Sequence, residues 1–90
     1  FGLMRKHYLK EYKSGIYQGM VLSGNLKEHL LMVQERAESQ FDTLVEQMSE
    51  REGVTEQLKE ENQLLWVQKM NNIRARAEEV VREEIIYCNG

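Results

Sequence analysis

Apolar side chains recur at steps of three and four residues along two long stretches of the chain. The first stretch begins at Leu26 and ends at Met48, and the second begins at Trp66 and ends at Val80. This period places the apolar side chains of each stretch on one face of an α-helix. We therefore predict two long helices, over residues 25–52 and 55–87, whose apolar faces carry Leu26, Leu30, Val33, Ala37, Phe41, Leu44 and Met48, and then Trp66, Met70, Ile73, Ala77 and Val80.

Residues 1–24 divide into two shorter helical stretches. Ser14-Gly15 interrupts the first stretch, because glycine lowers helix propensity, and this predicts helices over residues 3–13 and 16–23. Gly24 then ends the second stretch. Asn25 followed three residues later by Glu28 resembles a capping box, which predicts that these two side chains cap the amides at the start of the first long helix.

A tight reversal is predicted between the two long helices. Gly53 fits a left-handed residue just beyond a helix C-terminus, and Thr55 fits the N-cap of the next helix. So short a connection predicts an antiparallel hairpin about 40 Å long. The predicted fold class is all-α: one helical domain over residues 1–90, in which a basic helical segment (1–24) packs on a helical hairpin (25–87).

The predicted hairpin leaves apolar surface uncovered, because each long helix buries one stripe and the short helices cover only part of it. Such surface is commonly covered by a second copy or by another protein. We expect a homodimer or higher oligomer in which Trp66, Met70, Ile73 and Ala77 lie near the shared packing. Phe41 is expected to fill a wider layer of the core, as is Trp66.

Asn72 and Arg76 belong to a polar stripe of the last predicted helix. As exposed side chains they would only keep the helix soluble. At an interface they would matter more, because an unsatisfied guanidinium is costly and would fix the register of packing. The sequence leaves both interpretations open.

Composition indicates a small soluble helical domain. The 90 residues include 41% hydrophobic residues and no proline, the residue that most often breaks a helix. No apolar run approaches the roughly 20 residues that span a bilayer. Cys88 is the single cysteine, which fits a reducing compartment, so we expect a cytoplasmic protein without a membrane contact. Because the chain opens at Phe1, we expect it to be a fragment.

Patterns that carry catalysis or bind metals do not stand out in the sequence. His7 and His29 lie on different predicted elements, and no glycine-rich phosphate loop occurs. The acidic residues Glu56, Glu60 and Glu61 have no histidine at helical spacing that would complete a metal site. We therefore expect no enzyme activity, no cofactor, no metal and no small-molecule substrate.

Positive charge is concentrated at the start of the chain. Residues 1–24 carry four basic groups against one acidic group, a net charge of +3, whereas residues 25–62 carry four against ten, a net charge of −6. Cations contact phosphates without regard to base sequence, and tyrosines can stack on bases. An ordinary solvated helix face is the alternative interpretation. The functional interpretation predicts a surface for duplex DNA made of Arg5, Lys6, His7, Tyr8, Lys10, Tyr12 and Lys13.

Four strings of the sequence stand out as a set: Arg5 to Glu11, Leu22 to Leu26, Gly53 to Lys59 and above all Trp66 to Glu79. Together they resemble the TnpV family of bacterial transposon-encoded proteins, over nearly the whole chain. The resemblance implies a small protein carried on a mobile element beside a recombinase, and a further N-terminal segment before Phe1. It implies no catalytic residues. The family has no firmly assigned activity, although a role like that of an excisionase has been suggested.

We expect a non-enzymatic accessory protein of a bacterial mobile element. In the leading hypothesis a helical dimer presents its basic N-terminal helices to duplex DNA, or to a recombinase bound there, and assists excision. The alternative is a helical module for protein–protein interaction or oligomerisation with no DNA contact.

Overall fold

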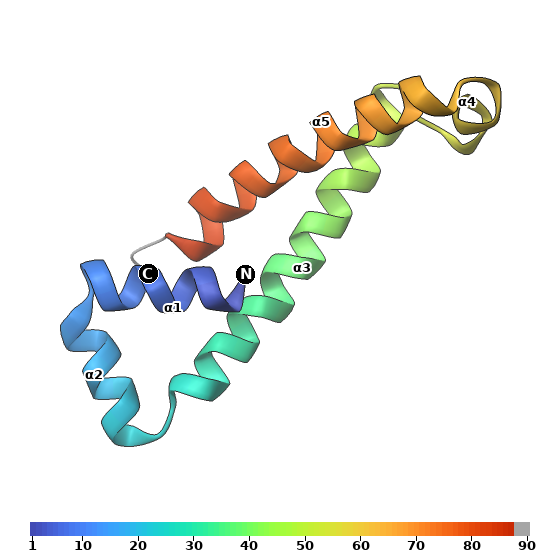
Figure 1. Ribbon diagram of the computed structural model, residues 1–90. Coiled ribbons are helices and arrows are strands. Elements are labelled where there is room, and N and C mark those ends of the chain that lie inside the picture. Colours follow the sequence, from blue (N-terminus) through green and yellow to red (C-terminus); the bar gives the residue numbers. More distant parts are fainter. Residues whose placement is uncertain (88–90) are drawn as a thin grey trace.

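A computed structural model describes residues 1–87 as a rod of helices, 55 Å long and 19 Å across in both other directions (Figure 1). The helices are α1 (Gly2–Tyr12), α2 (Ser14–Ser23), α3 (Leu26–Arg51), α4 (Glu56–Glu61) and α5 (Gln63–Val81), and a π-helical turn (Arg82–Ile86) continues α5. The described residues form no strand, so the all-α prediction is confirmed. Cys88 lies outside the described residues.

Helix α5 runs back along α3, and the two helices form the long arm of the rod (Figure 1). We call its two ends the head and the tip. The tip comprises the last turns of α3, helix α4 and the first turn of α5. The head comprises α1, α2 and the first two turns of α3, and there α1 packs on α3 and on the π-helical turn.

Gly24 and Gly53 end α2 and α3 in the same way. Their φ angles, 80° and 70°, lie in the left-handed region, which glycine enters without a steric penalty. Beyond Gly53 the Val54 amide donates to the Ser49 carbonyl at 2.8 Å, which closes the end of α3. The prediction that Gly53 is left-handed and ends the first long helix is confirmed.

The two predicted N-caps have different outcomes. Thr55 caps α4 as predicted, because its hydroxyl oxygen accepts a hydrogen bond from the Leu58 amide at 3.4 Å. The capping box predicted at Asn25 and Glu28 is wrong. Asn25 has a helical backbone, with φ −92° and ψ −3°, and its side chain makes no capping hydrogen bond. A capping side chain ordinarily reaches the first amides from an extended backbone.

The last helix is not continuous, so the prediction of one helix over residues 55–87 is wrong. Asn62 interrupts it with φ −153° and ψ 86°, and its side-chain oxygen accepts from the Leu65 amide at 3.1 Å. Asn62 therefore acts as the N-cap of a new helix, α5, and α4 stops before it. Residues 82–86 depart a second time from the predicted α-helix, because they form the π-helical turn.

The break between α1 and α2 falls at Lys13 and not at the predicted Ser14-Gly15. Lys13 has φ −136° and ψ 50°, whereas Ser14 and Gly15 lie within α2. A Cβ added at Gly15 would meet nothing within 4 Å. This glycine therefore neither turns the chain nor allows a close approach.

Two groups of buried side chains fill the rod. One group lies next to the head, where α3 meets the end of α5, and we call it the head group: Val33, Ala37, Val81 and Ile86. The other lies toward the tip, and we call it the tip group: Val54, Met70 and Ile73.

Phe41 packs on the head group and Trp66 on the tip group, and both rings are half-buried. Met70, Ile73 and Ala77 are buried inside a single chain, which leaves them no free surface for a second copy. Among the residues expected near shared packing, Trp66 keeps exposed surface.

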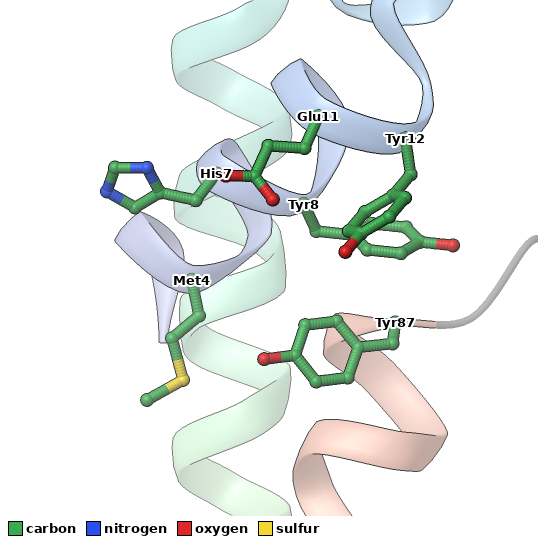
Figure 2. A pocket seen from close by; sticks show the side chains of 6 residues that line it. All are labelled: Met4, His7, Tyr8, Glu11, Tyr12 and Tyr87. Carbon is green, nitrogen blue, oxygen red and sulfur yellow. The ribbon is translucent and has the colours of Figure 1, made fainter.

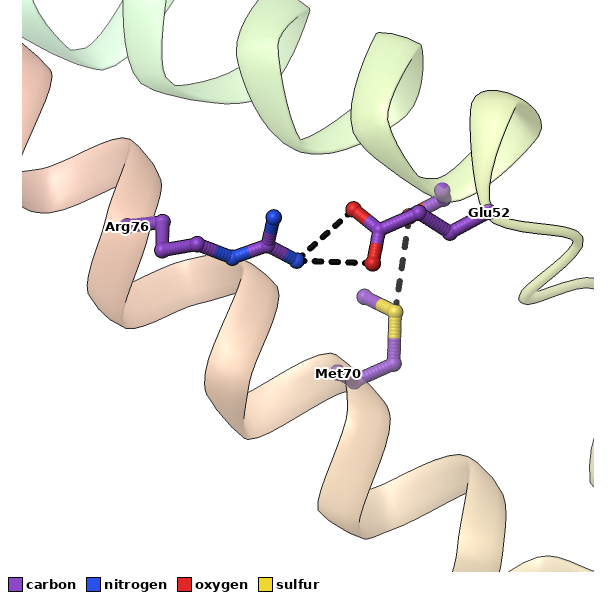
Figure 3. Close-up of polar contacts among 4 residues, drawn as sticks. Glu52, Met70 and Arg76 are labelled. Carbon is purple, nitrogen blue, oxygen red and sulfur yellow. Dashed lines mark hydrogen bonds and ion pairs between the residues drawn. The ribbon is translucent and has the colours of Figure 1, made fainter.

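Arg76 contacts its own chain across the arm. Its Nη2 donates to both carboxylate oxygens of Glu52, at 2.8 and 2.7 Å, and Met70 lies beside this pair (Figure 3). Both charged side chains are exposed, so the pair contributes at most about 1 kcal/mol. Asn72 is exposed as well.

Ile73→Ala is expected to lower the free energy of unfolding by about 2–5 kcal/mol, because the fully buried isoleucine would leave a cavity in the tip group. Leu64 on the same helix is 70% exposed, so Leu64→Ala should change that free energy by less than about 0.5 kcal/mol. Urea unfolding followed by circular dichroism measures both. Equal effects of the two substitutions would show that α5 faces another way.

Candidate nucleic-acid interface

Three lysines share one face of α1 and its end. Lys6, Lys10 and Lys13 follow at steps of four and three residues, which aligns them along a helix. Lys10 is exposed, and its Nζ lies 5.7 Å from the ring centroid of Tyr17 on α2. This cation–π contact holds Lys10 at the corner between the two helices. We call Lys6, Lys10 and Lys13 the lysine stripe.

A fourth cation joins the stripe from α3. Lys27 lies in the first turn of α3 and lines one groove together with Lys6. The reversal at Gly24 brings the two together by turning α3 back toward α1. Sequence reasoning missed Lys27 because it counted as part of the acidic segment 25–62. The turn signal at Gly24 is what could have assigned it to the head.

Arg5 does not belong to the exposed surface, in contrast to the prediction that it contacts DNA. Its side chain is buried, with only 7% of the residue exposed. Its Nη1 donates to the Ile86 carbonyl at 2.8 Å, and its Nε donates to His29 Nε2 at 3.3 Å. A buried charge is tolerated where it is well bonded. The Arg5 cation is therefore used inside the head.

His29 accepts this hydrogen bond as a neutral imidazole, with Nε2 unprotonated. Burial, and secondly the positive charge of Arg5, lower the pKa of His29 from its ordinary value of 6.5. His29 thereby ties α3 to α1 at the head. Sequence reasoning treated this histidine only as a failed catalytic candidate and missed its structural contact.

Aromatic side chains gather on a different flank of α1 (Figure 2). Tyr8 lies between Tyr12 and Tyr87, with ring centroids 5.5 and 5.3 Å from theirs. Tyr8 is two residues from Lys6 and from Lys10, about half a helical turn around α1. The structure therefore does not bring these tyrosines onto the surface of the lysine stripe. They line an open pocket of about 450 Å³ together with Met4, His7 and Glu11.

Residues 1–87 contain neither a cluster of metal-binding side chains nor a helix that could cross a membrane. Nowhere in this part of the chain do three or more histidine, cysteine, aspartate or glutamate side chains come together as a metal site. No described helix is both long enough and apolar enough to cross a bilayer. We therefore take the lysine stripe with Lys27 as the candidate site.

Comparison with known families supplies the deciding observation, since the family model of transposon-encoded protein TnpV matches residues 1–86. The chain belongs to the TnpV family. No curated protein and no solved structure matches it. The matched region of this TnpV-family chain runs through the π-helical turn, so it contains the lysine stripe, Lys27 and the Arg5–His29 contact.

The Arg5–His29 contact should make the stability of this TnpV-family chain depend on pH. The pKa of His29 is lower in the folded chain than its ordinary value of 6.5, so the unfolded chain binds a proton first as the pH falls. The free energy of unfolding should therefore decrease as the pH falls through 6.5 toward the lowered pKa, and His29 should add no pH dependence above that range. Urea unfolding at a series from about pH 7.5 to about pH 5.5 measures this.

Two variants assign the effect. His29→Gln keeps a side-chain oxygen that can accept from Arg5 but does not titrate, so this component of the pH dependence should disappear. His7→Gln removes an exposed histidine and should leave the component in place. A pH dependence that persists unchanged in His29→Gln would contradict the role given to His29.

Proposed function

We propose that this TnpV-family chain is a non-enzymatic accessory protein of a bacterial transposon that binds duplex DNA through its lysine stripe. The observation that carries the proposal is the alignment of Lys6, Lys10 and Lys13 along α1, with Lys27 of α3 beside Lys6. Ammonium groups on one surface can approach successive phosphates and displace their counterions, which is the main source of sequence-independent DNA affinity.

The proposed role is architectural. Lysine contacts to phosphates position a protein on DNA without reading the bases. The acidic excess of residues 25–62, a net charge of −6, disfavours phosphates along the arm and so confines them to the head. Such a chain would assist a recombinase by holding or bending DNA, as an excisionase does, and would leave the choice of site to the recombinase.

The proposal includes no reaction. General acid–base catalysis by histidine requires a ring held beside a reacting group in a shielded pocket. His29 accepts a hydrogen bond from Arg5, and His7 is exposed on α1 at an open pocket. Neither arrangement supports a catalytic role.

Protein binding is the second candidate function, and the exposed apolar side chains of α2 favour it. No residue of α2 is buried, and Leu22 is 88% exposed. Ile16 and Val21 on the same helix are also exposed. Exposed apolar surface of this kind often marks a contact with another protein. A recombinase, or a second copy of this chain, would be the partner.

Replacing Lys6, Lys10 and Lys13 together by glutamate is expected to abolish retention of duplex DNA in a mobility-shift assay. The change turns three attractive contacts into repulsive ones, and retention by the parent should weaken steeply between low and moderate salt. The matched control replaces three exposed cations of α4 and α5 by glutamate, namely Lys59, Lys69 and Arg74. It should reduce DNA binding much less. Circular dichroism verifies that both variants fold.

Two results would sink the DNA-binding proposal. One is a parent chain that gives no shift even at low salt. The other is an equal loss of binding in the two triple variants, because net charge rather than the lysine stripe would then govern retention. The first result would leave protein binding as the function to pursue.

A further inference from the structure

Two grooves lie at opposite ends of the rod. The head groove, of about 350 Å³, is formed between α1 and α3, and Lys6, Lys27 and Leu31 are among its lining residues. The tip groove, of about 510 Å³, is formed where α3 gives way to α4 and α5. Its lining includes Trp66 and three glutamates, Glu46, Glu50 and Glu56.

One side of α3 contributes a lining residue to each groove. Leu31 lines the head groove and Ser49 lines the tip groove, and they are 18 residues apart on one helix. Eighteen residues make about five turns of 3.6 residues, so the two side chains leave the helix in the same direction, about 27 Å apart. A single partner lying along this side of the rod can reach both grooves.

The two ends carry opposite charge. Residues 1–31 have five basic groups against two acidic groups, a net charge of +3, and residues 46–61 have two against six, a net charge of −4. A second rod laid alongside in the same direction would put like charges together. A second rod turned end for end would put each basic head against an acidic tip, which is the favourable arrangement.

Each groove also carries apolar surface that the chain leaves in water. At the head, Leu3 and Leu31 are 72% and 52% exposed. At the tip, the indole of Trp66 is half-buried, and Lys59 Nζ lies 4.8 Å from its ring centroid, so only part of the ring faces water. Tryptophan is prominent among the residues that dominate the energetics of protein interfaces, and leucines that reach its ring would be shielded from water.

We propose that a second copy of this chain docks antiparallel on the first, so that the head groove of each copy lies against the tip groove of the other. A two-fold axis across the middle of the rod forms both contacts at once and closes the assembly at two chains. Lys6 and Lys27 then meet the glutamates of the opposite tip groove, and this charge pairing sets the direction of docking.

The dimer does not rest on the DNA-binding proposal. The two proposals share Lys6 and Lys27, whereas Lys10 and Lys13 belong to the DNA-binding surface alone. Lys10 and Lys13 do not line the head groove, so they stay open to phosphates in the dimer. Replacing Lys10 and Lys13 by glutamate should weaken DNA binding and leave the dimer intact. Failure of one proposal is thereby distinguishable from failure of the other.

A charge exchange between two variants tests the dimer. The head variant carries Lys6→Glu and Lys27→Glu, and the tip variant carries Glu46→Lys and Glu50→Lys. In sedimentation equilibrium at a concentration where the parent has the mass of two chains, each variant alone should be a monomer. An equimolar mixture of the two should regain the mass of two chains, because each reversed end then meets an end of opposite charge.

Matched controls separate the contact from its alternatives. The substitutions Glu79→Lys and Glu83→Lys have the same charge change and the same spacing as the tip variant, lie outside both grooves, and should leave the dimer intact. Leu31→Ser should weaken the dimer strongly and lower the melting temperature of the monomer only slightly, since Leu31 is already half exposed.

Four results would overturn the proposal. A parent chain that is monomeric over the whole concentration series excludes the dimer. A dimer that survives either charge reversal uses another surface, as does a mixture of the two variants that stays monomeric. Masses above two chains would indicate open head-to-tail assembly in place of the closed two-fold pair.

Discussion

The head of this protein depends on the buried guanidinium of Arg5. This side chain donates to the carbonyl of Ile86, 81 residues further along the chain, and to the imidazole of His29, 24 residues along. Its guanidinium carbon also lies 5.5 Å from the ring centroid of Tyr8. Because a buried charge is costly without such contacts, α1 has few positions in which Arg5 is satisfied. A slide of α1 along α3 would separate the cation from both acceptors, so one charge fixes three elements relative to one another.

The same constraint determines what α1 presents to solvent. With Arg5 and Leu9 turned inward, helical geometry leaves the lysine stripe on one flank of α1 and Tyr8 on another. On the tyrosine flank Tyr8 packs against Tyr87, so this contact helps to hold the residue after the π-helical turn against α1. In the proposed DNA contact, the lysine stripe offers a row of ammonium groups, which suits phosphates better than bases. The position of a core contact thus determines which side chains α1 presents to solvent.

Spacing alone predicts α3 to within one residue at each end, together with the glycine that ends it, because apolar period and glycine conformation are local properties of the sequence. The break at Asn62 could not be predicted from spacing, because the apolar residues continue at helical spacing on both sides of it. The helix is interrupted by a single hydrogen bond, in which the Asn62 side-chain oxygen accepts from the Leu65 amide and so starts a new helix. The burial of Arg5 was hidden because a cation among cations is expected in water, and its acceptor lies at the far end of the sequence. Lys27 belongs to the site because the chain reverses at Gly24 and places Lys27 beside Lys6. Spacing along the sequence does not show this tertiary contact.

Charge acts locally on a molecule of this shape. The rod is 55 Å long, whereas charges in physiological salt are screened beyond about 8 Å, so the acidic tip cannot cancel the field of the basic head. The head therefore behaves as a basic surface although the whole chain has a formal net charge of −3. Screening also limits the range of the attraction between two copies, because the head of one copy and the tip of the other attract each other only once they are nearly in contact. In the proposed dimer, pairing of lysines with glutamates would select the direction of docking, whereas the stability of the contact would come from the apolar side chains that it removes from water.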